Sequence, residues 1–221
     1  MFGEDFLVGT IFRLLALLPA LTLHEFCHAY SAYRLGDYTP MAQGRVTLNP
    51  LAHLDPIGTL MILFAPIGWA KPVQINPSNF RNPARDVVIT SAAGPLANVV
   101  QGTFWGLVLR AFVLGGVTNP LALGFLGLLT IINFVLALFN LIPLGPLDGH
   151  EILAYFLPAR AQLRFRQFNQ YGFLILLGIV VLSWLTPINI LGLFLILPAD
   201  LAGYVISGQD VWGLVGQSGI F

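Results

Sequence analysis

The chain has 221 residues, of which 57% are hydrophobic and only 9% are charged. Soluble domains carry about 25% charged residues, so a surface this poor in charge excludes a water-soluble globular protein. Ten basic and ten acidic residues cancel to a formal net charge of zero, so nothing in the charge balance indicates nucleic-acid binding. The single cysteine, Cys27, excludes an intrachain disulfide.

Long stretches without charge mark the segments that can lie in the hydrocarbon of a bilayer. A helix needs about 20 mostly apolar residues to cross a core about 30 Å thick. We expect five such helices, at residues 6–35, 86–116, 121–142, 170–186 and 188–207. The apolar segment 56–70 has only 15 residues, about 22 Å as a helix. We therefore expect that segment to be re-entrant or shallow.

The most polar part of the chain, residues 36–85, separates the first two expected helices. Within it, residues 44–49 and 71–75 have the composition of short strands bounded by proline and asparagine. We expect these two segments to pair as a small β-hairpin. The expected fold class is therefore an all-α polytopic membrane protein with about five full transmembrane helices, one re-entrant or shallow segment and this hairpin.

The first expected helix contains His24-Glu25-Phe26-Cys27-His28, an H-E-x-x-H pattern. Residues four apart lie on the same face of a helix, so both imidazoles can bind one metal ion while Glu25 reaches a water on it. The alternative is a pair of histidines that only hydrogen-bond to neighbouring helices. Because ionisable groups are costly in hydrocarbon and usually functional there, the context favours metal binding.

A catalytic zinc ion usually has three protein ligands and a water, so one more histidine or carboxylate is needed. The candidates are His53, Asp55, Asp148, His150 and Glu151. Asp148 lies in a segment with two prolines and two glycines, which prevents a regular helix there. Irregular backbone at membrane depth is tolerated only around a protected cavity, which draws attention to this residue.

The combination of His24-Glu25-x-x-His28 with Leu147-Asp148-Gly149 resembles the site-2 protease family of intramembrane zinc metalloproteases. Further segments agree with the recurrent pattern of that family, namely Gly44–Pro56, Gly68–Val73, Gly94–Asn98 and Asn140-x-x-Pro143. The resemblance covers residues 20–158. Two features depart from the common pattern: His150-Glu151 replaces a frequent Gly-Arg, which makes His150 a competing ligand, and no PDZ or CBS module is inserted.

The resemblance implies one zinc ion per chain, held by His24, His28 and Asp148, with Glu25 as the base. It also implies that Asn140 and Asn98 help to hold the substrate backbone or to polarise its carbonyl. Residues 1–158 would then form the catalytic membrane core, and residues 159–221 a C-terminal transmembrane hairpin with a short tail.

Topology provides an independent argument for the same ligand set. Helices 86–116 and 121–142 cross out and back, which returns Asp148 to the side where the first helix ends, provided that 56–70 does not cross. Eight of the ten basic residues fall on that side, and the positive-inside rule makes it the cytoplasm. We expect a multi-pass protein of the cell membrane, with its N-terminus outside, its tail from residue 208 inside and its active site near the cytoplasmic face.

The expected function is that of an intramembrane zinc endopeptidase that hydrolyses peptide bonds in or next to transmembrane segments, as in regulated intramembrane proteolysis. Its expected partners are a membrane-protein substrate and the lipid bilayer, with no nucleic acid. Two alternatives stay open, a homologue that binds membrane segments without cleaving them and a metal or ion transporter. A transporter does not explain a glutamate placed between two ligand histidines.

Overall fold

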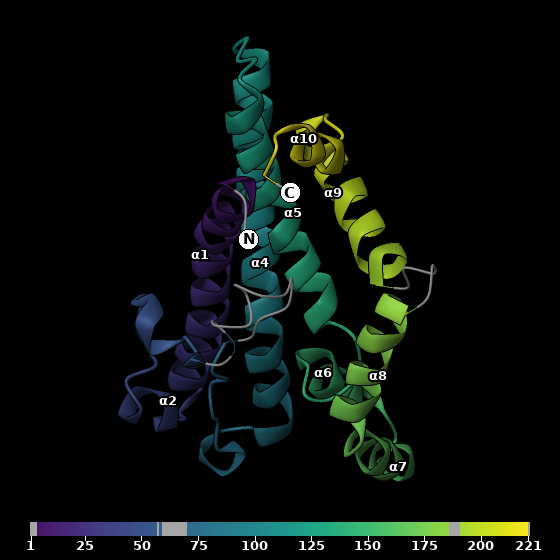
Figure 1. The fold of residues 1–221 in the computed structure, drawn as a ribbon. Coiled ribbons are helices and arrows are strands. Elements are labelled where there is room, and N and C mark those ends of the chain that lie inside the picture. The colour runs from purple at the N-terminus through teal and green to yellow at the C-terminus, as the bar shows by residue number, and fades with distance from the viewer. Residues whose placement is uncertain (1–3, 57, 59–69, 186–190, 221) are drawn as a thin grey trace.

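The structure is a computed structural model that describes every residue except 1–3, 57, 59–69, 186–190 and 221. Three helices are long and apolar enough to cross a membrane, and they are α1 (Glu4–Leu35), α4 (Pro83–Leu114) and α5 (Pro120–Asn140). They confirm the first three expected helices. These three helices lie side by side and form the centre of the molecule (Figure 1).

Two further pairs of helices pass the same test only if each bent pair is taken as one span. One pair is α7 (Ala159–Asn169) with α8 (Gly172–Leu185), bent by 57°. The other joins the π-helical turn η3 (Gly192–Ile196) and α9 (Leu197–Ser207) to α10 (Val211–Gln217), bent by 98°. The described part of the chain is therefore a helical membrane protein with three to five candidate spans.

Asparagine–proline pairs set the starts of α4 and α5. Asn82 and Asn119 each cap a helix whose first residue is proline, and their side-chain oxygens accept backbone N–H groups of the first turn. Proline at this position removes an N–H that has no helical partner, and the asparagine satisfies another. The turn between the two helices is thus short, and α5 runs back antiparallel to α4.

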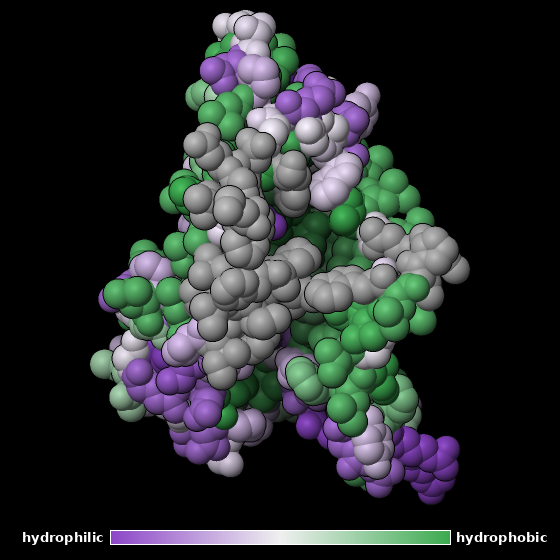
Figure 2. Space-filling model, viewed as in Figure 1, coloured by the Kyte–Doolittle hydropathy of each residue, from purple (hydrophilic) through white to green (hydrophobic). Residues whose placement is uncertain are grey.

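The helices of the bundle pack closely because glycines face larger side chains. A Cβ atom built on Gly102 would lie 3.1 Å from the Phe134 ring, and one on Gly106 would lie 3.0 Å from Ile206. Small residues of this kind allow membrane helices to approach each other. Figure 2 shows hydrophobic residues over the middle height of the visible face and hydrophilic residues gathered at both ends, as a membrane-spanning bundle requires.

Short elements occupy the loop after α1. These are α2 (Thr39–Ala42) and the 3₁₀ turns η1 (Pro50–Ala52) and η2 (Pro77–Asn79). Asp37 ties this loop together, since its carboxylate accepts hydrogen bonds from the Thr39 backbone and hydroxyl, the Asn76 backbone and the Asn79 amide, at 2.6–3.0 Å. Burial alone would raise the pKa of Asp37, but these hydrogen bonds outweigh it and lower the pKa below its usual value.

The expected β-hairpin is not confirmed, because the described residues of this loop contain no strand. The Arg45 guanidinium takes the place of a ladder, donating to the backbone oxygens of Ala52 and Lys71. Prolines at 50, 56, 72 and 77 remove N–H donors that a regular ladder needs. Side-chain hydrogen bonds therefore join segments that we expected to pair through their backbones.

Most of the expected re-entrant segment 56–70 lies outside the described residues, but its two ends are described. Leu54 and Ala70 form an isolated antiparallel bridge, and the Lys71 N–H donates to His53 O at 2.8 Å. The chain therefore leaves and returns at the same point. This closeness of the two described ends agrees with the expectation that α4 begins on the side where α1 ends.

The C-terminal part differs from the expected hairpin. Gly172, at the start of α8, packs against Gly145 just beyond the end of α5. At the other end of the bundle, the Ile206 carbonyl near the end of α9 accepts a hydrogen bond from Arg110 of α4. Helices α8 and α9 thus follow one another in the same direction along the bundle (Figure 1).

This direction brings the two chain ends to the same end of the molecule. A Cβ on Gly9 would lie 2.3 Å from Ile220 O, so the tail contacts the first turns of α1. The sequence had predicted the tail on the opposite side. The physical reason for the difference is that hydropathy records how long an apolar segment is but not the direction in which it runs.

Candidate active site

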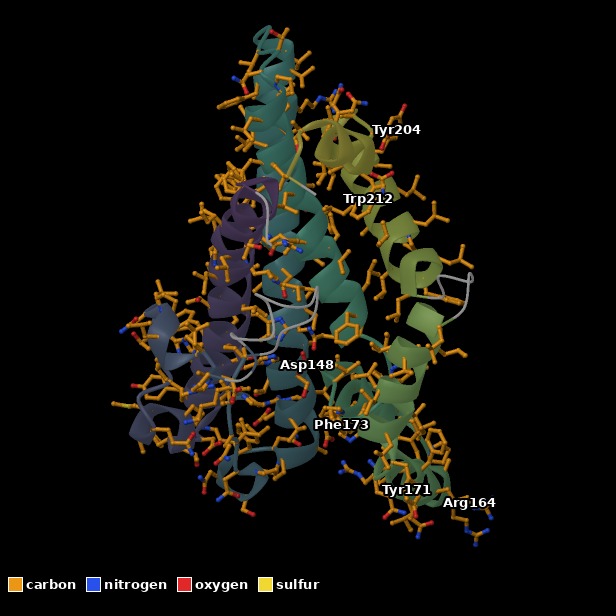
Figure 3. The ribbon with its side chains drawn as sticks, in the orientation of Figure 1. Asp148, Arg164, Tyr171, Phe173, Tyr204 and Trp212 are labelled. Carbon is orange, nitrogen blue, oxygen red and sulfur yellow. The ribbon has the colours of Figure 1, made fainter. Side chains whose placement is uncertain are left out.

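The two histidines of α1 and the aspartate at the start of α6 (Asp148–Phe156) lie together. Asp148 Oδ2 is 3.3 Å from His24 Nε2 and 3.3 Å from His28 Nε2, and the two Nε2 atoms are 3.0 Å apart. One ligand atom from each residue falls within 4.8 Å of the others. Figure 3 places Asp148 in the interior, in the lower half of the view. Of the expected third ligands, the structure thus brings Asp148 to the histidine pair.

Helix α4 fixes the orientation of both imidazole rings. His24 Nδ1 donates to Asn98 Oδ1 at 2.6 Å, and His28 Nδ1 donates to the Thr90 carbonyl at 2.7 Å. A hydrogen bond from one ring nitrogen to an oxygen acceptor leaves the lone pair of the other nitrogen available to a metal. Both Nε2 lone pairs therefore point into the space that Asp148 faces.

The Asn98 amide is oriented by a second asparagine. Asn98 Nδ2 donates to Ala20 O at 3.1 Å and to Asn133 Oδ1 at 2.9 Å, while Asn133 Nδ2 donates to Leu129 O at 2.8 Å. Each amide nitrogen is thus committed to acceptors, which leaves Asn98 Oδ1 as the group that faces His24. Asn98 and Asn133 are fully buried, so these bonds are not weakened by water.

On α4, Gly94 makes room for the histidine pair of α1. A Cβ atom at this position would lie 2.3 Å from His28 Nε2 and 2.7 Å from His24 Nε2. These distances are below any that real Cβ contacts show, so no residue other than glycine fits without movement of the rings. The close approach of the α4 backbone is therefore part of the site.

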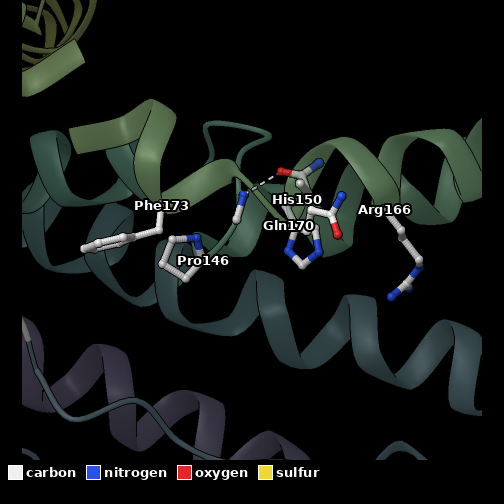
Figure 4. A pocket seen from close by; sticks show the side chains of 7 residues that line it. Pro146, His150, Arg166, Gln170 and Phe173 are labelled. Carbon is white, nitrogen blue, oxygen red and sulfur yellow. Dashed lines mark hydrogen bonds between the residues drawn. The ribbon is translucent and has the colours of Figure 1, made fainter. Parts of the chain in front are cut away.

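The loop before Asp148 is held from two sides. A Cβ on Gly149 would lie 2.2 Å from Leu141 O, so α6 begins directly against the end of α5. On the other side, Asn169 Oδ1 accepts the Gly145 N–H at 2.6 Å, as the dashed line in Figure 4 shows. The junction of α7 and α8, which we had assigned to a separate C-terminal unit, therefore takes part in positioning Asp148.

The residues of the cluster fit a divalent metal ion. With both Nδ1 atoms donating, three lone-pair atoms face one another, which is repulsive unless a cation lies between them. Asp148 Oδ2 is buried, and no hydrogen bond to it is found among the described residues. Two neutral imidazoles and one carboxylate form a donor set that is typical of catalytic zinc.

Glu25, the expected base, is buried beside the cluster. Its Oε2 accepts the backbone N–H of Val73 at 3.2 Å, which attaches the loop after residue 70 to α1. Arg45, which holds Lys71, is also buried. Its positive charge interacts favourably with the Glu25 carboxylate, although burial lowers the pKa of Arg45.

In the described part of the chain, none of the other candidate ligands joins the three ligand atoms that gather within 4.8 Å. His53 Nε2 donates to Thr47 O at 2.8 Å, and Asp55 Oδ1 accepts the Gly58 N–H at 2.8 Å. His150 lies 3.5 Å from Glu151 and lines a separate 390 Å³ cavity with Pro146, Gln170 and Phe173 (Figure 4). Asn140 is the last residue of α5, and its Nδ2 donates to Leu136 O at 3.0 Å.

Three residues of the site were not identified from the sequence. Asn133 is an isolated amide in a highly apolar helix, and its cost in hydrocarbon is the signal that could have revealed it. Gly94 lies within a segment that the resemblance had marked, but its contact with the histidines is a tertiary feature. Thr90 contributes only a backbone carbonyl, for which a sequence carries no signal.

The chain is similar in sequence to known proteins. Its residues 115–183 match the sequence profile of Peptidase family M50, a match that crosses the boundary expected at residue 158. It is 39% identical over 176 residues to the protein named "Putative zinc metalloprotease YwhC" of Bacillus subtilis, covering 77% of this chain and 80% of that protein.

Two mycobacterial proteins named "Putative zinc metalloprotease Rip2" are also similar. The identity is 33% over 183 residues for that of Mycolicibacterium smegmatis, covering 77% of this chain and 65% of the relative. It is 27% over 165 residues for that of Mycobacterium tuberculosis H37Rv, covering 72% and 62%. No solved structure matches at a comparable level of significance. The histidine–aspartate cluster and these relatives together identify the chain as a member of Peptidase family M50, the site-2 protease family of membrane zinc metallopeptidases.

Proposed function

We propose that this zinc metallopeptidase is an intramembrane endopeptidase that hydrolyses peptide bonds in or next to the transmembrane segments of other membrane proteins. The observation that carries the proposal is the position of His24, Glu25 and His28 within a helix that is apolar enough to span a bilayer. A site placed there meets substrates within the membrane or at its surface. The basic residues at this end of the bundle favour the cytoplasmic side of the cell membrane.

The zinc ligands in this proposal are His24 Nε2, His28 Nε2 and Asp148 Oδ2. When bound, zinc supplies Lewis-acid activation of the attacking water and of the scissile carbonyl. Glu25 accepts the proton of that water and returns it to the leaving amine. Since Val73 N–H occupies Oε2, the proton is carried on Oε1.

The two asparagines that the sequence marked have different roles in this proposal. Both ends of the Asn98 amide are engaged by protein groups, so Asn98 holds His24 in its ligand tautomer and does not touch substrate. Asn140 lies eight residues before Asp148 at the end of α5 and keeps the substrate-binding role. The substrate must unwind locally, because the carbonyl of a helical peptide bond is engaged in a hydrogen bond.

Glu25→Gln is the test of this function. The amide keeps the shape of the side chain but cannot accept a proton, and loss of a general base costs about 10²–10⁴ in rate. The purified, zinc-loaded protein in lipid vesicles is incubated with single-span membrane proteins, and new termini are identified by mass spectrometry. Cleavage by the wild type and not by Glu25→Gln, at equal zinc content, supports the proposal.

The same assay separates the proposal from its alternatives. A homologue that only binds membrane segments gives no new termini with either protein. Zinc flux across the vesicle membrane without cleavage would identify a transporter. Asp148→Ala should lose zinc and activity while the control His150→Ala keeps both, and the reverse result would show that the third ligand is misassigned.

A further inference from the structure

The metal centre lies at one end of the contact between α4 and α6. Val87, Gly94 and Asn98 are spaced by seven and four residues, so they lie on one face of α4. Asp148 and Tyr155, seven residues apart, share a face of α6 in the same way. The two helices pack against each other along this length (Figure 1). A feature between Val87 and Tyr155 therefore lies on the same helix faces as the residues of the metal centre.

A cavity of 320 Å³ lies at the other end of this contact. Ala84, Val87 and Val88 of α4 form one wall, Tyr155 of α6 and Gln162 of α7 form the other, and Pro77 borders it. Each border is continuous with a part of the metal centre. Helix α4 carries Gly94 and Asn98, α6 begins with Asp148, and the segment that ends at Pro77 contains Val73, which bonds to Glu25.

We propose that this cavity is a substrate-specificity subsite that receives a bulky apolar side chain, such as leucine or phenylalanine, from the polypeptide being cleaved. The inference rests on the proposed endopeptidase function and adds to it a preference for one substrate position. That preference is carried by the wall of α4 around Val87.

The α4 side of the cavity favours an apolar occupant. Ala84, Val87, Val88 and Pro77 offer no polar side-chain groups. The charged residues at its border, Glu151 and Arg166, are 3.0 Å apart and pair with each other, so they do not call for a charged ligand. A glycine or alanine would leave the space unfilled and forfeit the contacts of its walls.

The position of the preferred residue follows from helix geometry. Seven residues of helix rise about 10.5 Å, which separates Val87 from Gly94 and Tyr155 from Asp148. An extended polypeptide advances about 3.3 Å per residue. The side chain in the cavity therefore belongs to the second or third residue from the scissile bond, on the side toward the start of α4, which is the cytoplasmic side in the proposed topology.

The test is a library of single-span reporter proteins in which the five residues on each side of the cytoplasmic membrane boundary are randomised. Purified wild-type protein, loaded with zinc in lipid vesicles, is incubated with the library and the new termini are sequenced. We expect leucine or phenylalanine at one fixed position, two or three residues to the cytoplasmic side of the cut, to be favoured over glycine about 10-fold or more.

Two substitutions at Val87 move this preference in opposite directions. Val87→Trp fills the cavity and should shift the preference to glycine and alanine, whereas Val87→Ala enlarges it and should favour phenylalanine and tryptophan over leucine. Val100→Trp is the matched control, because Val100 is also on α4 but is 68% exposed on the outside of the bundle. It should leave the profile and the zinc content unchanged.

The outcomes distinguish the subsite from the function. Active cleavage with a flat profile at these positions, or an unchanged profile in both Val87 variants, overturns the subsite alone. If Val87→Trp fails to fold or loses zinc, the direction of the shift in Val87→Ala decides. Zinc binding by the wild type without cleavage of any library member overturns the proposed function, and the subsite with it.

Discussion

Gly94 gives a sharp test of the metal centre, because one added methyl group meets both ligand histidines. In Gly94→Ala the new Cβ would lie 2.3 Å from His28 Nε2, a separation that must grow to at least 3.0 Å. The ring must therefore retreat by at least 0.7 Å. Metal–ligand distances tolerate deviations of only about 0.2 Å, so this movement is several times larger than a zinc site accepts.

The histidine rings cannot move without breaking other bonds. His24 and His28 are bonded to Asn98 and Thr90, which lie on the same helix as Gly94, at 2.6 and 2.7 Å. A shift of α4 away from α1 stretches these bonds, and a shift of the rings alone bends them. Loss of an outer-shell partner weakens metal binding by roughly 10–100-fold. We expect Gly94→Ala to weaken zinc binding by at least as much.

Helix propensity alone predicts that Gly94→Ala stabilises the protein, whereas the geometry of the site predicts damage, so the experiment separates the two. Replacing glycine by alanine inside a helix stabilises it by about 1 kcal/mol when nothing else changes. Gly178→Ala in α8 is the matched control, since a Cβ there has nothing within 4 Å. Zinc affinity is measured by competition with a chelator, and thermal unfolding is measured in detergent. A Gly94→Ala variant that binds zinc as tightly as the wild type would refute the proposed geometry.

Three further predictions concern the supporting structure. The folded pKa of Asp37 lies below its unfolded value, so the carboxylate stabilises the fold above about pH 4 and this contribution is lost as the pH falls through the folded pKa. Asp37→Asn should flatten that acid dependence of thermal unfolding, and equal slopes would contradict this. Asn169→Ala should speed zinc loss to a chelator by roughly several-fold. Asn169→Asp, which keeps the acceptor oxygen for the Gly145 N–H, should restore the slow rate of the wild type. An unchanged rate in Asn169→Ala would show that Asn169 does not position Asp148. Single cysteines at Asn119 and Gln217, in a Cys27→Ala background, should label from one side of the membrane and one at Gln162 from the other. Labelling of Gln217 together with Gln162 would instead support the C-terminal hairpin.

The sequence alone was sufficient for features that depend on local spacing. His24 and His28 are four residues apart in an apolar helix, and helical geometry puts them on one face wherever that helix is located. The lengths of α1, α4 and α5 followed from their apolar residues, because the thickness of the bilayer core sets a minimum length. The resemblance to the site-2 protease family implied that Asp148 pairs with the histidines, and the number of crossings between them, a property of the chain order, agreed with it.

The tertiary structure decided every feature that depends on how distant segments meet. Asn98 and Asn133 could be marked as polar groups in apolar helices. Only the packing of α1, α4 and α5 shows that Asn98 orients His24 and that Asn133 orients Asn98. The need for glycine at 94 arises from the approach of two helices that are far apart in the sequence. The direction of α9 was inaccessible for the same reason, since an apolar helix has the same hydropathy whichever way it runs, and only its contacts with α4 and α5 fix its orientation.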